Sequence, residues 1–538
     1  MSAIVISNGV IRLDAWSDPV EALVVDGGVV TYAGTLDGAN SSVGRATRRV
    51  DLGGATVVPG LVESHVHLVF AGLTDSWTDC RSPLNNSVSD LQAALRKDLN
   101  DVADGRWLRG WGYDDTLLAE GRHPTRDDLD AVSTDVPIVM SHISGHFAVA
   151  NSKALEIAYI HDDSPDPDEG RYVHDSDGRL TGLMWEMGAV HKVLGAVPGV
   201  TDQEVRDAAT RSLQLAASRG MTAVHDLGIG TAAGALELDA WQRLAENRSI
   251  PIRVAGYLRS DLLGTRLHDD PLFFKRPEDG NFRLAGAKFW SDGSIQGLSG
   301  ALKFPYSCTD SDCGELLFSP EDLYQQLADV DAAGGQCAVH ANGDLAISTV
   351  AQAYAAIHQK TGRSDARHRV EHLQMASKED IDSLVSSRSV ASIFANHVYY
   401  WGDRHRDRFL GADRAARIDP TRDAESAGLH FGMHSDCPIT PMDILATFRT
   451  AVTRQTSSGS VLGKDQRIGR RAALHALTAD SAYLVRDEGR RGTLVPGMDA
   501  DLTVLDADVV GLPIDATQKA RAVATMVAGE FVVDTVGF

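Results

Sequence analysis

The chain has 538 residues, 43% of them hydrophobic, with 50 glycines and a formal net charge of −23. This length exceeds one simple core, so two or three domains are expected, and the composition is that of a globular, loop-rich α/β protein. The excess of 74 acidic over 51 basic residues argues against nucleic acid or an anionic membrane as a partner. Five cysteines without a CxxC pair argue against a disulfide framework or a zinc ribbon.

The start of the chain gives no sign of export. The segment MSAIVISNGVIRLDAW lacks the basic beginning and the long apolar run of a secretion signal. No apolar run elsewhere approaches the roughly 20 residues that cross a membrane. We therefore expect a cytoplasmic protein without a membrane partner.

Both ends of the chain are rich in short β-strand patterns. Residues 1–58 contain AIVISNGVIRL, ALVVDGGVVTYAG and RRVDLGGATVVPG, and the Asp-Gly-Gly in the second run is a hairpin signal. Residues 485–538 repeat this character in GTLVPGMDADLTVLD and AVATMVAGEFVVD. The pattern predicts one small β-sandwich domain assembled from residues 1–58 and 485–538.

The middle of the chain, residues 59–484, alternates strand and helix patterns. Eight runs have the continuous apolar character of parallel strands that are buried on both faces: TVVPGLVESHVHL, MTAVHDLG, IRVAGYL, FRLAGAKFWSDG, QCAVHANGD, RHRVEHLQ, VASIFANHVYY and LHFGMHSDCP. Eight such strands with helices between them predict an α/β fold of the (β/α)8 TIM-barrel type. The first two strands are separated by far more than the roughly 30 residues of one βα unit. Residues 70–205 are therefore expected to be largely an inserted subdomain.

A His-x-His motif ends the first predicted barrel strand. His65 and His67 alternate with Val66, so both imidazoles point to the same side of a strand. Two neutral imidazoles at this spacing can chelate one divalent ion. A lone motif of this kind is weak evidence, and its weight depends on ligands at the ends of other strands.

Lys288, in the predicted strand AGAKFWSDG, admits two interpretations. It could be a lysine that reaches solvent from a strand end or pairs with Asp292. It could instead be held neutral by apolar surroundings and nearby metal ions. A neutral amine can add CO2 and become a carbamate, which bridges two cations as a carboxylate would. Histidine-bearing strand ends before and after Lys288 favour the second interpretation.

Three more candidate ligands end later strands. His340 in AVHANGD and His372 in RVEHLQ end consecutive predicted strands, and Asp436 in GMHSDCP ends the eighth. The C-terminal strand ends of a barrel converge on one mouth, so these residues are expected to share a site with the candidates above. Two metal ions there would polarise a scissile carbonyl and provide a bridging hydroxide, so no serine or cysteine nucleophile is needed.

Further motifs stand between the candidate ligands: GWGYDD (110–115), SGHFAVANSKAL (144–155), DGRLTGLMWE (177–186), GMTAVHDLG (220–228), AKFWSDGS (287–294) and VPGMDADLTVLD (495–506). With these motifs in this order, the chain resembles the amidohydrolase superfamily, and within it amidohydrolase family 3, along essentially its whole length. The most similar characterised activity is that of the N-substituted formamide deformylases. The aromatic residue that usually follows the Ser-Asp of strand eight in the family is replaced here by Cys437, so the family's pocket shape is not carried over at this position, while the ligand is intact.

The resemblance implies a metal-dependent hydrolase of amide-type carbon–nitrogen bonds. It implies two divalent ions per chain, and the imidazole-rich ligand set favours zinc. By resemblance, the ligands fall into three groups, in which His65, His67 and Asp436 bind the first metal, His340 and His372 bind the second, and carboxylated Lys288 bridges the two.

Three residues are expected to act on the substrate. Asp436 is the expected general base toward the attacking water and then the acid toward the leaving amine. His397, in the predicted seventh strand, is placed to hydrogen-bond a substrate carbonyl. His146, in the insertion, is a substrate contact by resemblance, and for both histidines a structural role is the alternative. Glu186 belongs to a family motif but receives no role.

The expected partner is a small amide, either an N-substituted formamide or a small N-acyl amine. Trp111, Tyr113, Tyr399 and Trp401 could line an apolar pocket, and no arginine stands out at the strand ends to clamp a carboxylate. One alternative is a deaminase of a small heterocycle, which would not need Lys288. Another is a non-catalytic regulatory relative, which would be expected to have lost ligands that are all present here. A homodimer is consistent with base rates among soluble proteins.

Overall fold

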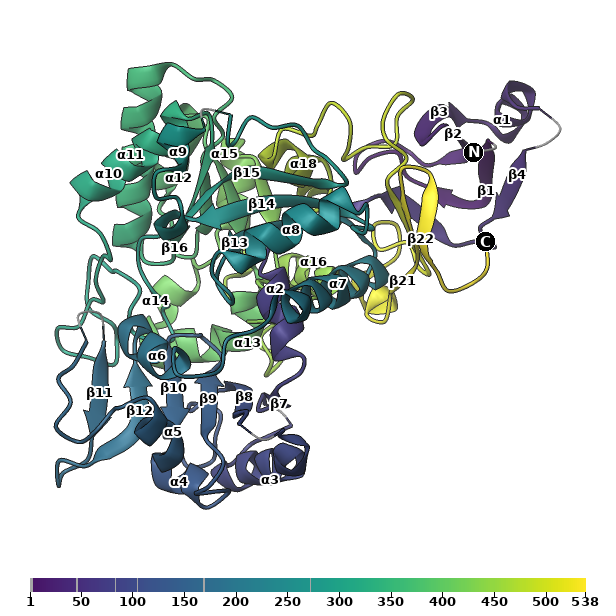
Figure 1. The fold of residues 1–538 in the computed structure, drawn as a ribbon. Helices are drawn as coiled ribbons and strands as arrows, with labels where there is room; N and C mark the ends of the chain where they lie inside the picture. Colours follow the sequence, from purple (N-terminus) through teal and green to yellow (C-terminus); the bar gives the residue numbers. More distant parts are fainter. Residues whose placement is uncertain (1–2, 45–46, 83, 104, 168–169, 271) are drawn as a thin grey trace. The chain divides into compact units, whose positions relative to one another are not determined.

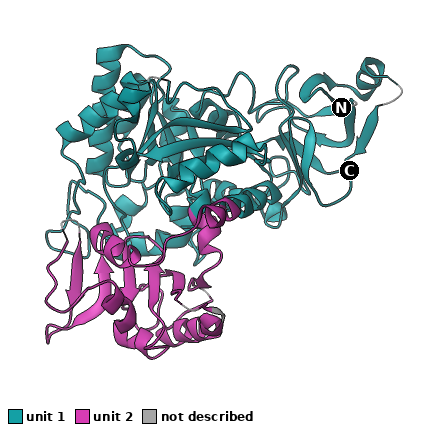
Figure 2. Ribbon diagram, in the orientation of Figure 1, with its two compact units in different colours: residues 1–69, 209–538 teal, residues 70–208 magenta. Residues whose placement is uncertain are grey.

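The computed structural model describes residues 3–44, 47–82, 84–103, 105–167, 170–270 and 272–538. The chain forms two compact units (Figure 2), unit 1 with residues 1–69 and 209–538 and unit 2 with residues 70–208. Helices α2 (Leu68–Thr74) and α7 (Asp202–Ser218) contain the two points where the chain passes between the units. Within the described ranges, none of the helices has the length and apolar character needed to cross a bilayer.

Unit 1 is built around eight parallel strands in the order of the sequence (Figure 1). Ladders join each strand to the next, and the first and last strands also contact each other, so the barrel is nearly closed and of the TIM type. Each predicted barrel segment supplies one strand of the barrel, which confirms the predicted α/β barrel. The strands are β6 (Leu61–Val66), β13 (Met221–Ile229), β14 (Arg253–Arg259), β15 (Phe282–Trp290), β16 (Gln336–Ala341), β17 (Arg369–His372), β18 (Val390–Ile393) and β19 (Phe431–Met433).

Helices follow the barrel strands, and local signals fix their ends. The Ser319 side chain caps the first turn of α10, a capping box at Ser377 starts α12, and Gly362 in the left-handed region ends α11. Helices α10, α11 and α12 pack side by side (Figure 1). The helices that lie wholly in unit 1 are α1 (Leu36–Ser42), α8 (Leu236–Glu246), α9 (Arg266–Asp269), α10 (Pro320–Ala332), α11 (Asp344–Thr361), α12 (Lys378–Ser386), α13 (Asn396–Arg404), α14 (Ala412–Ala415), α15 (Thr421–Ala427), α16 (Ile444–Thr453), α17 (Arg470–Ala476) and α18 (Ala479–Leu484).

The seventh predicted strand extends too far at its C-terminal end. β18 ends at Ile393, and helix α13 begins at Asn396, so His397 lies on a helix and its predicted place on a strand is wrong. The aromatic and β-branched residues of HVYYW favour a strand locally. The helix forms nevertheless because residues 396–398 and 401–402 are buried together, at the spacing of one helical face.

The first predicted strand divides at Gly60. Strand β5 (Thr56–Pro59) pairs with β20 (Leu502–Leu505) and β1 (Ile4–Ile11), whereas β6 pairs with β13 of the barrel. A Cβ atom at Gly60 would lie 2.0 Å from Oγ1 of Thr222, so only glycine allows this close approach. One apolar run therefore serves two different sheets.

Strands from both chain ends form a second sheet of unit 1. Its order is β22-β21-β20-β5-β1-β2-β3, with β4 paired to β1. In Figure 1 both termini lie at this sheet. The arrangement joins the two ends as predicted, while a two-layered sandwich and the boundaries at 58 and 485 stay predictions. The remaining strands are β1 (Ile4–Ile11), β2 (Val20–Asp26), β3 (Val29–Gly34), β4 (Arg48–Asp51), β20 (Leu502–Leu505), β21 (Ala522–Val527) and β22 (Glu530–Asp534).

Unit 2 has its own sheet and its own apolar core. The strand order is β11-β12-β10-β9-β8-β7. Its helices and strands are β7 (Thr78–Asp79), α3 (Val88–Asp98), β8 (Leu108–Tyr113), α4 (Arg126–Asp130), β9 (Ile138–His142), β10 (Phe147–Ala150), α5 (Ser152–Ile157), β11 (Arg171–His174), β12 (Leu180–Trp185) and α6 (Met187–Leu194). Buried side chains such as Leu95, Met140 and Leu183 hold the sheet against α3. The unit falls where an insertion was expected, and the predicted limits of 70 and 205 stay a proposal.

Candidate metal centre

The six candidate ligands lie at the C-terminal ends of barrel strands. His65 is the next-to-last residue of β6, and Lys288 is near the end of β15. His340 and His372 are at the ends of β16 and β17. Two candidates lie just beyond a strand, because β6 ends before His67 and β19 ends before Asp436. The strand ends of a TIM barrel form the usual place for an active site.

Three of the candidates form a compact group of ligand atoms. Oδ1 of Asp436 is 3.4 Å from Nε2 of His65 and 3.3 Å from Nε2 of His67. Nζ of Lys288 is 3.4 Å from the same nitrogen of His65. In the described part of the chain, the buried Oδ1 of Asp436 and Nδ1 of His67 have no hydrogen-bond partner. A buried acceptor without a partner is costly, so a divalent cation fits this donor set.

A buried carboxylate fixes the orientation of His65. Oε2 of Glu371 lies 2.7 Å from Nδ1 of His65, and Arg369 donates to Oε1 of the same carboxylate at 2.7 Å. Because a carboxylate can only accept, Nδ1 of His65 carries the proton and Nε2 presents a lone pair toward Asp436 and Lys288. Metal-binding histidines are commonly held in this way.

Lys288 is enclosed and does not reach solvent. The residue is 1% exposed, and burial lowers its pKa to about 8, although Glu371 and Asp436 act in the opposite direction. Asp292 accepts backbone N–H groups of Ala301 and Gly343, at 2.9 and 2.8 Å. At 1% exposure, Lys288 is not a surface lysine. A buried lysine with a lowered pKa has a larger neutral fraction, as carboxylation requires.

His340 and His372 lie together beside the first group. Their ring centroids are 4.5 Å apart, and the ring of His372 is 4.9 Å from that of His65. Nε2 of His340 lies 3.0 Å both from the carbonyl oxygen of Gly293 and from the side-chain nitrogen of Asn342. His372 and Asp436 have φ values of 72° and 53°. Such left-handed backbone is unfavourable for residues other than glycine and concentrates at functional sites.

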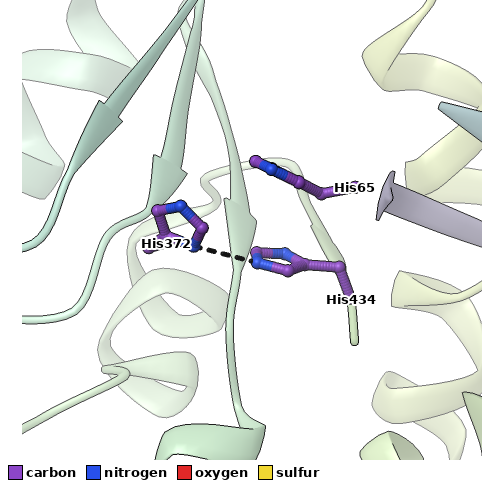
Figure 3. A group of neighbouring side chains, drawn as sticks. All are labelled: His65, His372 and His434. Carbon is purple, nitrogen blue, oxygen red and sulfur yellow. Dashed lines mark hydrogen bonds between the residues drawn. The ribbon is translucent and has the colours of Figure 1, made fainter. Parts of the chain in front are cut away.

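His434 is a buried histidine that sequence reasoning misses. Its ring stacks on that of His65 at 4.7 Å, and its Nε2 lies 3.1 Å from Nδ1 of His372 (Figure 3). Ligand atoms of His65, His372 and His434 lie within 4.8 Å of one another. Burial lowers the pKa of His372 and of His434 well below the ordinary value, so both rings are neutral. A signal existed in the two-residue spacing of His434 and Asp436, which matches that of His65 and His67.

Glu63 is a second residue that sequence reasoning misses. Its carboxylate accepts the side-chain hydroxyl of Ser435 at 2.7 Å and the backbone N–H of Ser435 at 3.1 Å. Burial raises the pKa of Glu63 to about 8, and the bonds to Ser435 oppose this rise. Glu63 therefore ties β6 to the segment that carries Asp436. Its position two residues before His65, on the same face of the strand, was the available signal.

His397 lies near the second pair of histidines. Its ring centroid is 6.3 Å from that of His372, and its Nδ1 is 3.0 Å from Oδ1 of the buried Asp419. With Nδ1–H donated to this carboxylate, Nε2 can donate to a substrate carbonyl only in the imidazolium form. The predicted contact of His397 with substrate stays a prediction.

His146 belongs to unit 2, in the loop between β9 and β10. Its Nδ1 lies 2.8 Å from Oε2 of Glu186, which gives Glu186 a partner and a positioning role within this unit. Glu186 has a φ of 64°, a conformation that costs energy in a glutamate. Trp111 and Tyr113 are also in unit 2 and are buried there. The predicted substrate contact of His146 stays a prediction.

The chain is similar to known proteins along almost its whole length. The model of the amidohydrolase family matches residues 48–533. YtcJ of Bacillus subtilis (strain 168), which carries the name of an amidohydrolase, is 28% identical over 521 residues that cover 96% of each chain. The N-substituted formamide deformylase of Arthrobacter pascens is 24% identical over 552 residues, covering 98% of this chain and 97% of the relative.

The fold is also that of a solved enzyme structure. An uncharacterized metal-dependent hydrolase from Pyrococcus horikoshii OT3 superposes with a TM-score of 0.77 at 26% identity, covering 95% of this chain and 99% of the other. Histidine and aspartate side chains gather here at the C-terminal strand ends, the face of a TIM barrel on which active sites lie. As its motifs predicted, the chain belongs to the amidohydrolase family and is a metal-dependent hydrolase that acts on carbon–nitrogen bonds.

Proposed function

We propose that the enzyme hydrolyses the amide bond of N-substituted formamides or of other small N-acyl amines. The observation that carries the proposal is the group formed by His65, His67 and Asp436, whose buried Oδ1 has no hydrogen-bond partner among the described residues, with the enclosed Lys288 beside it. The likeness to the deformylase of Arthrobacter pascens along 98% of this chain supports an amide of this class.

The donor set suits two divalent ions, and zinc is the ion that imidazole-rich sites favour. Bound there, such ions polarise a scissile carbonyl and lower the pKa of water. In the proposal, the ligands are His65, His67 and Asp436 for one ion and His340 and His372 for the other, with carboxylated Lys288 between them.

Asp436 and His397 would carry out the proton transfers and stabilise charge. One oxygen of the Asp436 carboxylate would hold the cation, and the other would take a proton from the attacking water and pass it to the leaving nitrogen. His397, whose ring is held by Asp419 through Nδ1, would hydrogen-bond the carbonyl oxygen of the substrate. Asp436 is 8% exposed and His397 is 2% exposed, and burial of this kind strengthens electrostatic stabilisation.

The arginines of the barrel support a substrate without a carboxylate. Arg369 is fully buried and donates to Glu371 and to the backbone oxygen of Ser64. Arg259, the last residue of β14, forms a bidentate pair with Asp261 at 3.0 and 2.8 Å. Neither guanidinium is placed to clamp a substrate carboxylate, as an N-acyl amino acid would invite. A small acyl group on an apolar amine fits better.

The substrate proposal is tested by a comparison of kcat/KM across four classes of compound. We expect N-benzylformamide and N-acetyl arylamines to exceed N-acyl amino acids by at least about tenfold, because Arg369 and Arg259 are already paired with Glu371 and Asp261 and would not receive the carboxylate of an amino acid. Formate or acetate release and amine release are measured together. Preference for N-acyl amino acids would contradict the proposal, and ammonia release from amino-heterocycles would establish the alternative deaminase.

Metal content provides a test that does not depend on the substrate. We expect the purified protein to hold one to two divalent ions per chain by elemental analysis, because the ligand groups need a cation to satisfy their buried atoms. Chelation should remove the ions and abolish hydrolysis, and zinc should restore both. A sample that is fully active without bound metal would refute the centre.

A further inference from the structure

A chain of hydrogen bonds leads away from His372 through the barrel interior. Nδ1 of His372 is 3.1 Å from Nε2 of His434, and Nδ1 of His434 is 2.7 Å from Oγ of Ser392. Oγ of Ser392 is 2.7 Å from Oγ of Ser64, which is 3.0 Å from the backbone oxygen of Met433. His434, Ser392 and Ser64 are all 0% exposed, so no solvent competes with these bonds.

The carbonyl oxygen of Met433, the last acceptor, fixes the direction of every hydrogen bond in this series. The carbonyl oxygen of Met433 can only accept, so Ser64 must donate its single hydroxyl proton there. Ser392 must then donate to Ser64, which leaves its oxygen to accept from Nδ1–H of His434. A neutral His434 with its proton on Nδ1 has a bare Nε2, so it accepts from Nδ1–H of His372.

We infer that His434 is a positioning residue that, with Ser392 and Ser64, holds His372 in the tautomer whose bare Nε2 can bind a metal ion. The inference rests on the proposed metal centre. His434 itself is not a third ligand of the group in Figure 3, because its two ring nitrogens form hydrogen bonds to His372 and Ser392. His434 therefore does for His372 what Glu371 does for His65, with a neutral acceptor in place of a carboxylate.

The reverse direction would disable the ligand. If Ser64 donated its hydroxyl proton to Ser392, no proton would lie between Ser64 and the carbonyl oxygen of Met433. Ser392 would then donate its own proton to Nδ1 of His434. His434 would then donate from Nε2 to Nδ1 of His372, and the proton of His372 would lie on Nε2. A nitrogen that carries a proton cannot bind a metal. The identity of the terminal acceptor thus decides whether His372 can act as a ligand.

The tautomers can be read directly in the metal-free protein. With 15N-labelled histidine, long-range 1H–15N spectra distinguish a proton on Nδ1 from a proton on Nε2. His372→Asn and His434→Asn variants identify the two signals by their disappearance. We expect both rings to carry the proton on Nδ1, and a proton on Nε2 of either ring would overturn the inference.

Metal affinity tests the consequence of the chain. In Ser392→Ala, His434 loses its acceptor, and we expect about 10- to 100-fold weaker binding of one zinc ion, with the other unchanged, by chelator competition. His434→Leu should show the same loss, whereas His434→Gln, whose amide can both accept and donate, should recover part of it. Ser389→Ala is the matched control, because Ser389 is buried at the other end of β18.

The outcomes separate the two proposals. Wild-type protein that takes up no zinc would refute the metal centre itself. If the wild type binds two ions, and folded Ser392→Ala and His434→Leu bind both with unchanged affinity, the positioning role of His434 is refuted while the centre stands. Thermal unfolding of each variant identifies any that lose metal only because they fail to fold.

Discussion

Asp436→Asn is expected to lower kcat by about 10² to 10⁴-fold, the range in which a general acid–base contributes. An amide is nearly the same size as a carboxylate, but it cannot take a proton from water and is a weak metal ligand. Asparagine also tolerates the left-handed backbone that Asp436 adopts at a φ of 53°, so the fold should persist. Initial rates and unfolding temperature, measured on the same preparation, test both parts.

A matched control exists for Asp436 in the same unit. Asp443 accepts the backbone N–H of Ala446 at 3.0 Å as the cap of α16, and asparagine caps helices equally well. Asp443→Asn should therefore keep wild-type kcat. Near wild-type turnover in Asp436→Asn would show that another group moves the proton, and His397 would be the first residue to test.

Lys288→Ala is expected to lose metal and rate together. The side chain is enclosed beside His65, so a carbamate formed on it would lie between the two proposed ligand groups. Alanine would remove this anionic group, so a small carboxylate such as acetate or propionate should take its place and restore part of the rate. Elemental analysis and turnover are measured with and without added carboxylate.

The carbamate itself can be observed. Incubation with 13C-bicarbonate should give a carbamate signal in the wild type that is absent from Lys288→Ala. Lys378→Ala, which removes an exposed lysine of α12, is the control for loss of a positive charge. If Lys288→Ala keeps two metal ions and normal turnover, the proposed bridge does not exist.

The barrel could be predicted from the sequence because each strand is a continuous apolar run with a polar residue at its end. The candidate ligands could be predicted for the same reason: a histidine, lysine or aspartate that follows such a run stands out. His397 was placed on a strand because HVYYW has strand-like composition, and burial along one helical face outweighs that local preference.

The hydrogen-bond chain behind His372 could not be predicted in this way. Ser64 and Ser392 lie on β6 and β18, far apart in the sequence, and they meet only inside the nearly closed barrel. A serine in an apolar strand also has no distinctive pattern. His434 is different, since its spacing from Asp436 was visible, and its role depends on a partner ring that the sequence does not reveal.

Gly60 makes the terminal sheet and the barrel inseparable. A single residue separates β5 of one sheet from β6 of the other, and the backbone N–H of Gly60 donates to the oxygen of Asp501 at 2.9 Å. Thr503 of β20 accepts the N–H of Leu61 at 3.2 Å, at the start of the strand that ends in the His-x-His motif. A change in the terminal sheet at Asp501 or Thr503 would therefore act directly on the start of β6, the strand whose other end carries His65.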